Sequence, residues 1–342
     1  MTRPSFFRGL ALTLLLALGA CAPLVQHAGL PDAAFQGPRL EPREFVSFDG
    51  AHLGLRRWDA AGEPWAVIIG LHGMNGYSGA FHLPGPYWAA HGVTTLAYDQ
   101  RGFGRSARRG IWGGRALMDQ DLRTFAALTR QRYPHAIIAV AGVSMGGAVA
   151  IDTFASDHMP SADRLVLLSP AVWGWSTEPV PYRIVLWLAA HTIRGVVINP
   201  PQALVDHIQA TDNIDELRRM GSDPLMIWGA RPDALYGLVG SMQRGWRETA
   251  DLKIPTFYLY GARDQIIPKR PAFQAANRLK PPGRTAYYAE GYHLLLSDRE
   301  NPKVWDDVLA FIRDPAAPLP SGAPPIPLPT KANLAAAKNP GH

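Results

Sequence analysis

A serine between glycines stands where a short apolar run gives way to small residues with helical spacing. Residues 136–141 are apolar, Gly142-Val143-Ser144-Met145-Gly146 follows, and residues 147–151 continue as Gly-Ala-Val-Ala-Ile. This order predicts a strand, a sharp turn that carries Ser144, and a helix. Glycines suit such a turn because larger side chains beside the serine would collide with neighbouring backbone. Ser144 could then act as a nucleophile, with the Met145 amide facing the developing negative charge; the alternative is a plain glycine-rich turn.

A serine nucleophile needs a base to accept its proton and a carboxylate to orient that base. In one chain order of such triads, the carboxylate and then the histidine follow the serine. Beyond residue 250 the histidines are His293 and His342, and His342 ends a Pro/Ala-rich tail, so we expect His293 to be the base. Asp264 turns out of an apolar, β-prone run and is the expected carboxylate. Asp298 is either a surface charge or a supporting partner of the site.

The elements that must position these residues alternate between strand-like and helical patterns. Continuous apolar runs, typical of strands buried on both faces, cover residues 66–71, 93–98, 137–141, 165–168 and 257–260. Helical patterns lie between them, at residues 87–91, 117–133 and 145–154. A hairpin at Asp49-Gly50 precedes the series. This alternation predicts a parallel sheet with helices on both faces, and catalytic groups at the carboxyl ends of the strands.

The segment 171–250 interrupts the strand series with aromatic and mostly helical sequence. We interpret it as a cap inserted over the catalytic edge of the sheet; the alternative is a set of extra helices packed at the side. The hydrolytic core would then consist of residues 41–170 and 251–314. Residues 315–342 are rich in Pro and Ala and are predicted to be disordered.

The N-terminal residues have the pattern of a secretory signal. Arg3 and Arg8 precede an apolar run at residues 10–18, and Leu18-Gly19-Ala20-Cys21 resembles the bacterial lipobox, in which the cysteine is lipidated. The predicted signal peptide is residues 1–20, and residues 21–40 would tether the lipid on Cys21 to the domain. The alternative is a cleaved signal with an incidental cysteine.

The composition limits the other possibilities. The 342-residue chain has 47% hydrophobic and 18% charged residues, as an ordinary globular protein does. Its single cysteine excludes an internal disulfide. Its net charge of +6 would favour anionic membrane surfaces, and no nucleic-acid-binding motif is present, so no nucleic-acid partner is expected. No metal is expected, since Asp119 and Asp121 lack His or Cys partners at a suitable spacing. Four nearby arginines either meet a phosphate headgroup or form a solvated face; they are Arg105, Arg108, Arg109 and Arg115.

Several motifs together resemble the monoacylglycerol lipase and lysophospholipase group of α/β-hydrolases, of the serine aminopeptidase S33 type. They are LHGM at residues 71–74, YDQRGFGRS at 98–106, GVSMGG at 142–147, YGARD at 260–264 and SDPL at 222–225. The resemblance covers residues 41–313 and implies a mostly parallel eight-stranded sheet and an ester hydrolase without a cofactor. It also implies that the Met74 amide is the second oxyanion donor, while His72 is expected to hold that loop.

The sequence thus predicts a serine ester hydrolase that acts on single-acyl-chain lipid esters through an acyl-enzyme. The alternatives are a lysophospholipase, a short-chain carboxylesterase, or a non-catalytic surface lipoprotein that uses the fold for binding. The expected location is the bacterial cell envelope, on the inner or the outer membrane. The oligomeric state is left open.

Overall fold

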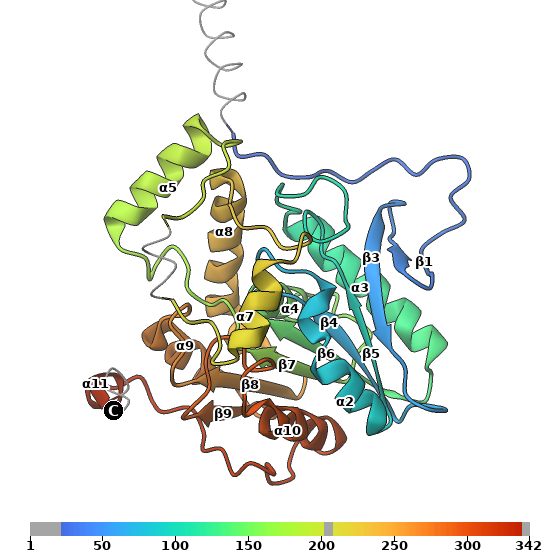
Figure 1. Ribbon diagram of the computed structural model, residues 1–342, viewed down its shortest axis with the longest axis vertical. Helices are drawn as coiled ribbons and strands as arrows, with labels where there is room; N and C mark the ends of the chain where they lie inside the picture. The colour runs from blue at the N-terminus through green and yellow to red at the C-terminus, as the bar shows by residue number, and fades with distance from the viewer. Residues whose placement is uncertain (1–21, 202–207, 337–342) are drawn as a thin grey trace, which may run out of the picture.

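The computed structural model describes residues 22–201 and 208–336, so the predicted signal peptide and Cys21 lie outside the described residues. Nine strands form one sheet in the order β1-β2-β3-β5-β4-β6-β7-β8-β9 (Figure 1). The strands are β1 (Arg39–Leu40), β2 (Glu44–Val46), β3 (His52–Trp58), β4 (Ala66–Leu71), β5 (Val93–Tyr98), β6 (Ile137–Val143), β7 (Arg164–Leu168), β8 (Thr256–Gly261) and β9 (Arg284–Tyr288). From β5 to β9 all neighbours are parallel, and β1 to β3 are antiparallel. The predicted α/β fold is confirmed. The sheet has nine strands and not the expected eight, because the two-residue β1 adds a short strand at one edge.

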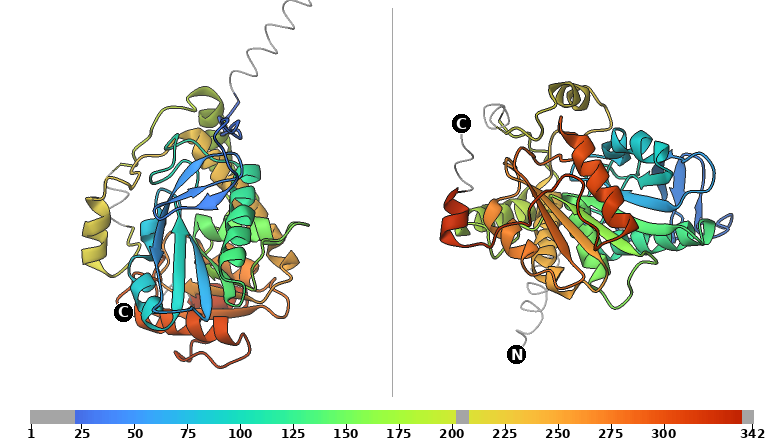
Figure 2. Two further views of the ribbon diagram at one scale, coloured as in Figure 1. Left: turned by 90° about the vertical axis from the view of Figure 1, so that its right-hand side faces the viewer. Right: turned by 90° about the horizontal axis from the view of Figure 1, so that it is seen from below.

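Helices cover both faces of this sheet, as Figure 2 shows. One face packs α3 (Arg115–Arg132), α4 (Met145–Phe154), α8 (Pro232–Glu248) and α9 (Lys269–Ala276). The other packs α2 (Pro84–Ala90) and α10 (Asn301–Arg313). Alternate residues of β4 separate into these two cores, with Val67 and Ile69 in the first and Ala66 and Ile68 in the second. Burial on both faces explains why β4 reads as a continuous apolar run.

Between β7 and β8 the chain forms α5 (Val180–Thr192), α7 (Ile214–Gly221) and α8. The last of these packs along α4, where a Cβ on Gly245 would lie 3.5 Å from the Ala148 Cα. Helix α8 is therefore part of the layer beside the sheet. The remainder of the predicted cap, α5 and α7, lies outside that layer, beyond the carboxyl ends of the strands (Figure 1).

The segment 315–330, predicted to be disordered from its Pro/Ala content, instead follows β9. The Tyr287 amide donates to the Pro324 carbonyl at 2.8 Å, and the Ile326 amide donates to Thr285 Oγ1 at 2.9 Å. Leu319 and Ile326 are buried. A proline-rich segment can pair in this way because the edge strand supplies the donor and proline still offers a carbonyl. Helix α11 (Lys331–Ala336) follows, and residues 337–342 lie outside the described residues.

Residues 22–29, which we call the N-terminal strap, lie against the fold although the sequence predicts a tether. The side chain of Val25 packs against a core cluster that contains Trp112. The Gln26 amide donates to the Trp112 carbonyl at 2.9 Å, and Gln26 Nε2 donates to the Ile111 carbonyl at 2.8 Å. The Gly29 amide donates to Asp49 Oδ2 at 2.8 Å. In the described ranges, no helix has both the length and the apolar content needed to cross a bilayer.

Candidate active site

Ser144 occupies the sharp turn between β6 and α4 that the sequence predicts. Its backbone has φ 52° and ψ −114°, a region that costs a non-glycine residue about 1–3 kcal/mol. The turn is held by the surrounding structure, since the Ser144 amide donates to the Leu168 carbonyl at 3.0 Å. A Cβ on Gly142 would lie 2.6 Å from the Gly146 carbonyl oxygen, and one on Gly146 would lie 2.3 Å from the Leu71 oxygen. Both glycines are therefore required by close backbone approach.

His293 and Asp264 form a buried hydrogen-bonded pair. His293 Nδ1 lies 2.9 Å from Asp264 Oδ2, and both side chains are almost fully buried. The other carboxylate oxygen, Oδ1, accepts the amides of Ile266 at 2.8 Å and Ile267 at 2.9 Å. With both oxygens engaged, the carboxylate has a fixed orientation and in turn fixes the imidazole ring.

The loops that carry this pair are joined by backbone hydrogen bonds. The Ala262 amide donates to the Tyr288 carbonyl and the Arg263 amide to the Gly291 carbonyl, both at 2.8 Å. Asp298 also holds the loop that carries His293, because its Oδ2 accepts a hydrogen bond from the Tyr292 amide at 2.8 Å. Burial raises the pKa of Asp298 to about 6. Of the two interpretations that the sequence left open for Asp298, the structure supports a partner that positions the histidine loop.

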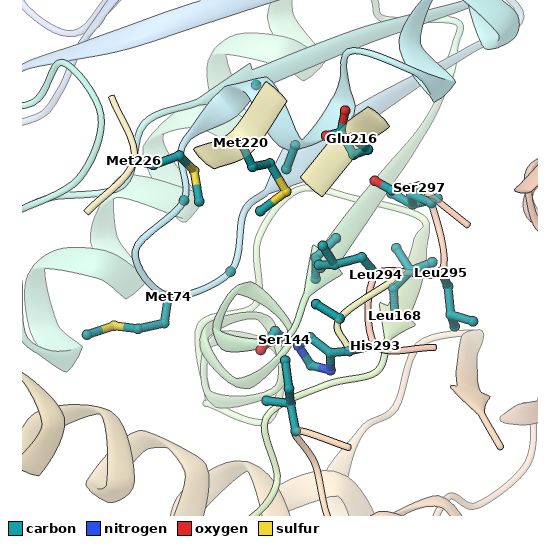
Figure 3. A pocket seen from close by; sticks show the side chains of 18 of the residues that line it. Met74, Ser144, Leu168, Glu216, Met220, Met226, His293, Leu294, Leu295 and Ser297 are labelled. Atoms are coloured by element: carbon teal, nitrogen blue, oxygen red, sulfur yellow. The ribbon is translucent and has the colours of Figure 1, made fainter. Parts of the chain in front are cut away.

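Ser144 and His293 line the same cavity, of about 230 Å³, and Figure 3 shows the serine side chain beside the imidazole ring. Met74 lines this cavity too, whereas the Met145 side chain is buried in the core behind the turn. The structure thus brings the three predicted catalytic residues to one place, at the carboxyl ends of β6, β8 and β9.

The Gly73–Met74 peptide has a defined orientation because its carbonyl is held from two sides. The Gly73 oxygen accepts the Gly76 amide at 3.2 Å and lies 2.8 Å from His72 Nδ1. In a trans peptide the amide points away from the carbonyl, so the Met74 N–H faces the opposite direction. Gly73 itself adjoins Ser144, since a Cβ on it would lie 3.3 Å from the Ser144 Cβ. The Met145 amide is in the first turn of α4, where it has no intrahelical acceptor.

His72 holds this loop as a neutral imidazole. The Gln100 amide donates to His72 Nε2 at 2.9 Å, which places the ring proton on Nδ1, where it donates to the Gly73 carbonyl. Complete burial lowers the pKa of His72 and keeps the ring uncharged. With both nitrogens engaged, His72 has the structural role that we expect from the sequence.

A polar wall, which the sequence did not predict, borders the otherwise apolar cavity. Arg219 donates to both carboxylate oxygens of Glu216, at 2.7 and 2.8 Å, and to Asp223 Oδ2 at 3.2 Å. Tyr77 donates its hydroxyl to the same Asp223 oxygen at 2.6 Å. Burial raises the pKa of Glu216, but hydrogen bonds from Arg219 and His82 outweigh it and lower the pKa to about 2. The SDPL motif, which contains Asp223, is the part of this wall that the sequence analysis singles out.

The side chains of the nearby arginines mostly interact with other residues of the protein. Arg105 donates hydrogen bonds to Asp99 and to the Leu55 carbonyl, and Arg115 forms an ion pair with Asp152. Arg109 donates to the backbone carbonyls of residues 224–226. Among the described residues, no three His, Cys, Asp or Glu side chains come together to hold a metal ion.

Known proteins are similar to this chain in sequence and in fold. The family model described as serine aminopeptidase, S33, matches residues 62–300. Monoglyceride lipase of Homo sapiens is 27% identical over 267 residues, covering 77% of this chain and 86% of the relative, and that of Mus musculus is 26% identical over 312 residues, covering 86% and 100%. A soluble variant of monoglyceride lipase from Saccharomyces cerevisiae, crystallised with a substrate analog, has the same fold, with a TM-score of 0.68, 17% identity and coverage of 85% and 100%.

Proposed function

We propose that this chain, which belongs to the serine aminopeptidase S33 family of α/β-hydrolases and is an ester hydrolase, cleaves lipid esters that carry one acyl chain through Ser144, His293 and Asp264. One observation carries the proposal. A histidine hydrogen-bonded at 2.9 Å to a buried carboxylate shares an apolar cavity with a serine on a strained turn. This is the arrangement that makes a hydroxyl nucleophilic.

In the proposed reaction, His293 takes the Ser144 proton as Oγ attacks the ester carbonyl. The amides of Met74 and Met145 stabilise the oxyanion, and Asp264 stabilises the imidazolium that forms. His293 then gives its proton to the departing alcohol, which leaves an acyl group on Ser144. A water molecule, deprotonated by His293, attacks this acyl group; the fatty acid leaves and the proton returns to Ser144.

The cavity walls favour an acyl chain. Its lining is mostly apolar and includes Leu168, Ile266, Leu294, Leu295 and Met226. Burying each methylene of a chain there would contribute about 0.8 kcal/mol, which favours medium or long chains over short ones. This preference is the argument against a short-chain carboxylesterase.

The polar wall favours an uncharged headgroup. Arg219 is already paired with Glu216 and Asp223, so its charge is balanced before any substrate binds. A phosphate headgroup would have to compete with two carboxylates for this guanidinium, whereas the hydroxyls of a glycerol need only hydrogen bonds. The wall therefore supports a monoacylglycerol as substrate over a lysophospholipid.

The proposal includes an N-terminal lipid on Cys21 and a location in the bacterial cell envelope. Its support is the sequence pattern: the single cysteine of the chain falls where the lipobox requires it. Several acyl chains on this residue would make membrane anchoring stable. Incorporation of radiolabelled palmitate into the unmodified chain and its loss in Cys21→Ser would test the anchor.

Labelling by a fluorophosphonate probe tests the chemistry. The unmodified chain should be labelled, Ser144→Ala should not, and Ser222→Ala, which removes an exposed cap hydroxyl, should be labelled normally. Hydrolysis rates on monoacylglycerols, lysophospholipids and short nitrophenyl esters then separate the substrate classes. Absence of labelling in the unmodified chain would favour the non-catalytic binding protein instead.

A further inference from the structure

The loop that carries His293 depends on other segments for its position. Between β9 and α10, where every residue is described, the chain forms turns and bends but neither a helix nor a strand. On one side of His293, the Tyr292 amide donates to Asp298, which belongs to the same loop. On the other side, the Leu294 amide donates to the Ala210 carbonyl at 2.8 Å. Ala210 lies in the cap insertion, so one of the two hydrogen bonds that flank the expected base comes from the cap.

A second hydrogen bond joins the same part of the cap to the loop that carries Asp264. The Gln209 amide donates to Gln265 Oε1 at 2.8 Å. Gln265 directly follows Asp264, and the next two amides of that turn are the ones that hold the Asp264 carboxylate. We call residues 209–212 the cap anchor. It is bound beside both members of the His–Asp pair.

Thr211 and Asp212 complete the cap anchor. Asp212 Oδ1 accepts the Arg299 amide at 2.8 Å, farther along the loop of the histidine. Thr211 is fully buried and interacts with Asp298. Burial raises the pKa of Asp298 to about 6, and the Thr211 side chain opposes this rise because it favours the carboxylate form. The cap anchor therefore also supports the residue that holds the histidine loop.

The cap anchor continues directly into the polar wall. Asn213 caps the start of α7, since its Oδ1 accepts the Glu216 amide at 3.2 Å. Glu216 lines the same cavity as His293 (Figure 3). One continuous stretch, residues 209–216, therefore joins the loops of the catalytic pair to the wall that would meet the headgroup.

We infer that Asp212 and Gln265 are positioning residues for the catalytic base. They bind the cap anchor to the two catalytic loops, and the anchor in turn holds the backbone beside His293 through Ala210. This inference rests on the proposed function, in which His293 takes the Ser144 proton. The cap then contributes to the chemical step itself, in addition to covering the substrate. A substrate too small to need the cap for binding should still need the cap anchor for its hydrolysis.

Hydrolysis of a soluble short nitrophenyl ester tests this role. Asp212→Ala removes the acceptor of the Arg299 amide, and kcat should fall about threefold to tenfold with KM nearly unchanged, because a displaced base affects the transition state. Asp212→Asn removes the charge but keeps a side-chain oxygen, and it should recover most of the rate. Gln265→Ala should act like Asp212→Ala. Asp215→Ala, on the exposed face of α7, is the matched control and should not change kcat.

Proton NMR provides a readout that a general loss of stability would not change. The Nδ1 proton of His293, in the hydrogen bond to Asp264, should resonate far downfield in the unmodified chain and be absent in His293→Gln. In Asp212→Ala, at a temperature well below Tm, this resonance should shift or broaden. In Asp212→Asn and in Asp215→Ala it should be preserved.

Three results would overturn the inference. One is hydrolysis of the soluble ester by Asp212→Ala at the rate of the unmodified chain, and another is a change confined to KM. The third is an Asp212→Asn variant as slow as Asp212→Ala, since the charge and not the hydrogen bond would then be responsible. The proposed function fails separately, if the unmodified chain neither hydrolyses the ester nor reacts with the fluorophosphonate probe.

Discussion

Gly261, the last residue of β8, lies against Gly291, in the turn after β9, so closely that a Cβ on Gly261 would come within 2.3 Å of the Gly291 carbonyl oxygen. This contact lies between the loops that carry Asp264 and His293. A hydrogen bond from the Arg263 amide to the same Gly291 carbonyl joins the two loops. The 2.9 Å hydrogen bond between the two side chains therefore depends on a backbone approach that only glycine permits.

Gly261→Ala is expected to separate these loops. Overpacking at a backbone contact should cost about 1–3 kcal/mol of stability, and displacement of the imidazole should lower kcat about tenfold to a hundredfold. Gly221→Ala is the matched control, because nothing lies within 4 Å of a Cβ there. Calorimetry and hydrolysis of a soluble ester measure both effects, and wild-type activity in Gly261→Ala would contradict this account of the site.

His72→Ala is expected to slow the chemical step while substrate binding in the cavity changes little. The Gly73 carbonyl would lose one of its two donors and the Met74 amide its fixed direction. We expect kcat to fall about tenfold to a hundredfold, with a much smaller change in KM, since loss of an oxyanion donor affects the transition state. His135→Ala, at an exposed position, provides the control. A change confined to KM would assign His72 to substrate binding instead.

Glu216→Gln is expected to shift headgroup selection. Without the Glu216 charge, Arg219 keeps one carboxylate partner, Asp223, and can attract an anionic headgroup. The ratio of kcat/KM for lysophosphatidylglycerol to that for monoacylglycerol should rise about tenfold, which corresponds to ~1.4 kcal/mol. Asp215→Asn on the exposed face of the same helix is the matched control. An unchanged ratio would mean that the polar wall does not contact the headgroup.

Glu248 is expected to make stability depend on pH. Burial, followed by the charge of the Asp152 carboxylate, raises the pKa of Glu248 from 4.5 to about 7, against the opposing effect of Arg115 and Arg244. The folded state therefore holds the proton more tightly, and the contribution of Glu248 to stability falls as pH rises from about 4.5 to about 7. Glu248→Gln removes this titration. Its Tm relative to the parent should be higher at pH 8 than at pH 5 by about 1–3 °C, whereas Glu63→Gln, at an exposed position, should show no such trend.

Arg101→Met is expected to destabilise the fold strongly. Arg101 donates to Asp121 and to both oxygens of Asp49, and all three side chains are almost fully buried. Removing the cation leaves two buried carboxylates unpaired, at a cost of about 3–5 kcal/mol. Arg57→Met breaks the more exposed pair with Asp59 and should cost less than about 1 kcal/mol. Urea denaturation distinguishes the two, and equal losses would show that burial does not determine the difference.

The sequence predicted those parts of the molecule that local pattern determines. Ser144 was found because the tight turn requires glycines at fixed positions, and Asp264 and His293 because each follows a recognisable strand. The ion pair between Arg219 and Glu216 can be predicted from the sequence, because residues three apart on one helix are neighbours. Its position at the cavity depends on how α7 lies over the sheet, which no local pattern encodes.

Two terminal segments were misjudged for the same reason. Composition predicts a tether over residues 21–40, and it predicts that the Pro/Ala-rich residues 315–342 are disordered because they cannot bury a core of their own. Their order comes from partners elsewhere in the chain: Trp112 accepts the Gln26 amide, and Thr285 accepts the Ile326 amide. These partners are far away in the sequence, so they can be identified only from the folded structure.

The proline-rich segment along β9 has a consequence for self-association. Strand β9 is the last of the sheet, and a bare final strand would offer its amides to any extended chain that met it. The Tyr287 amide already donates its hydrogen bond to the Pro324 carbonyl. The prolines of this segment have no N–H to donate, so they cannot extend the hydrogen-bond ladder to a further strand. The C-terminal segment thus covers this edge of the sheet, so that copies crowded together would not pair with one another through β9.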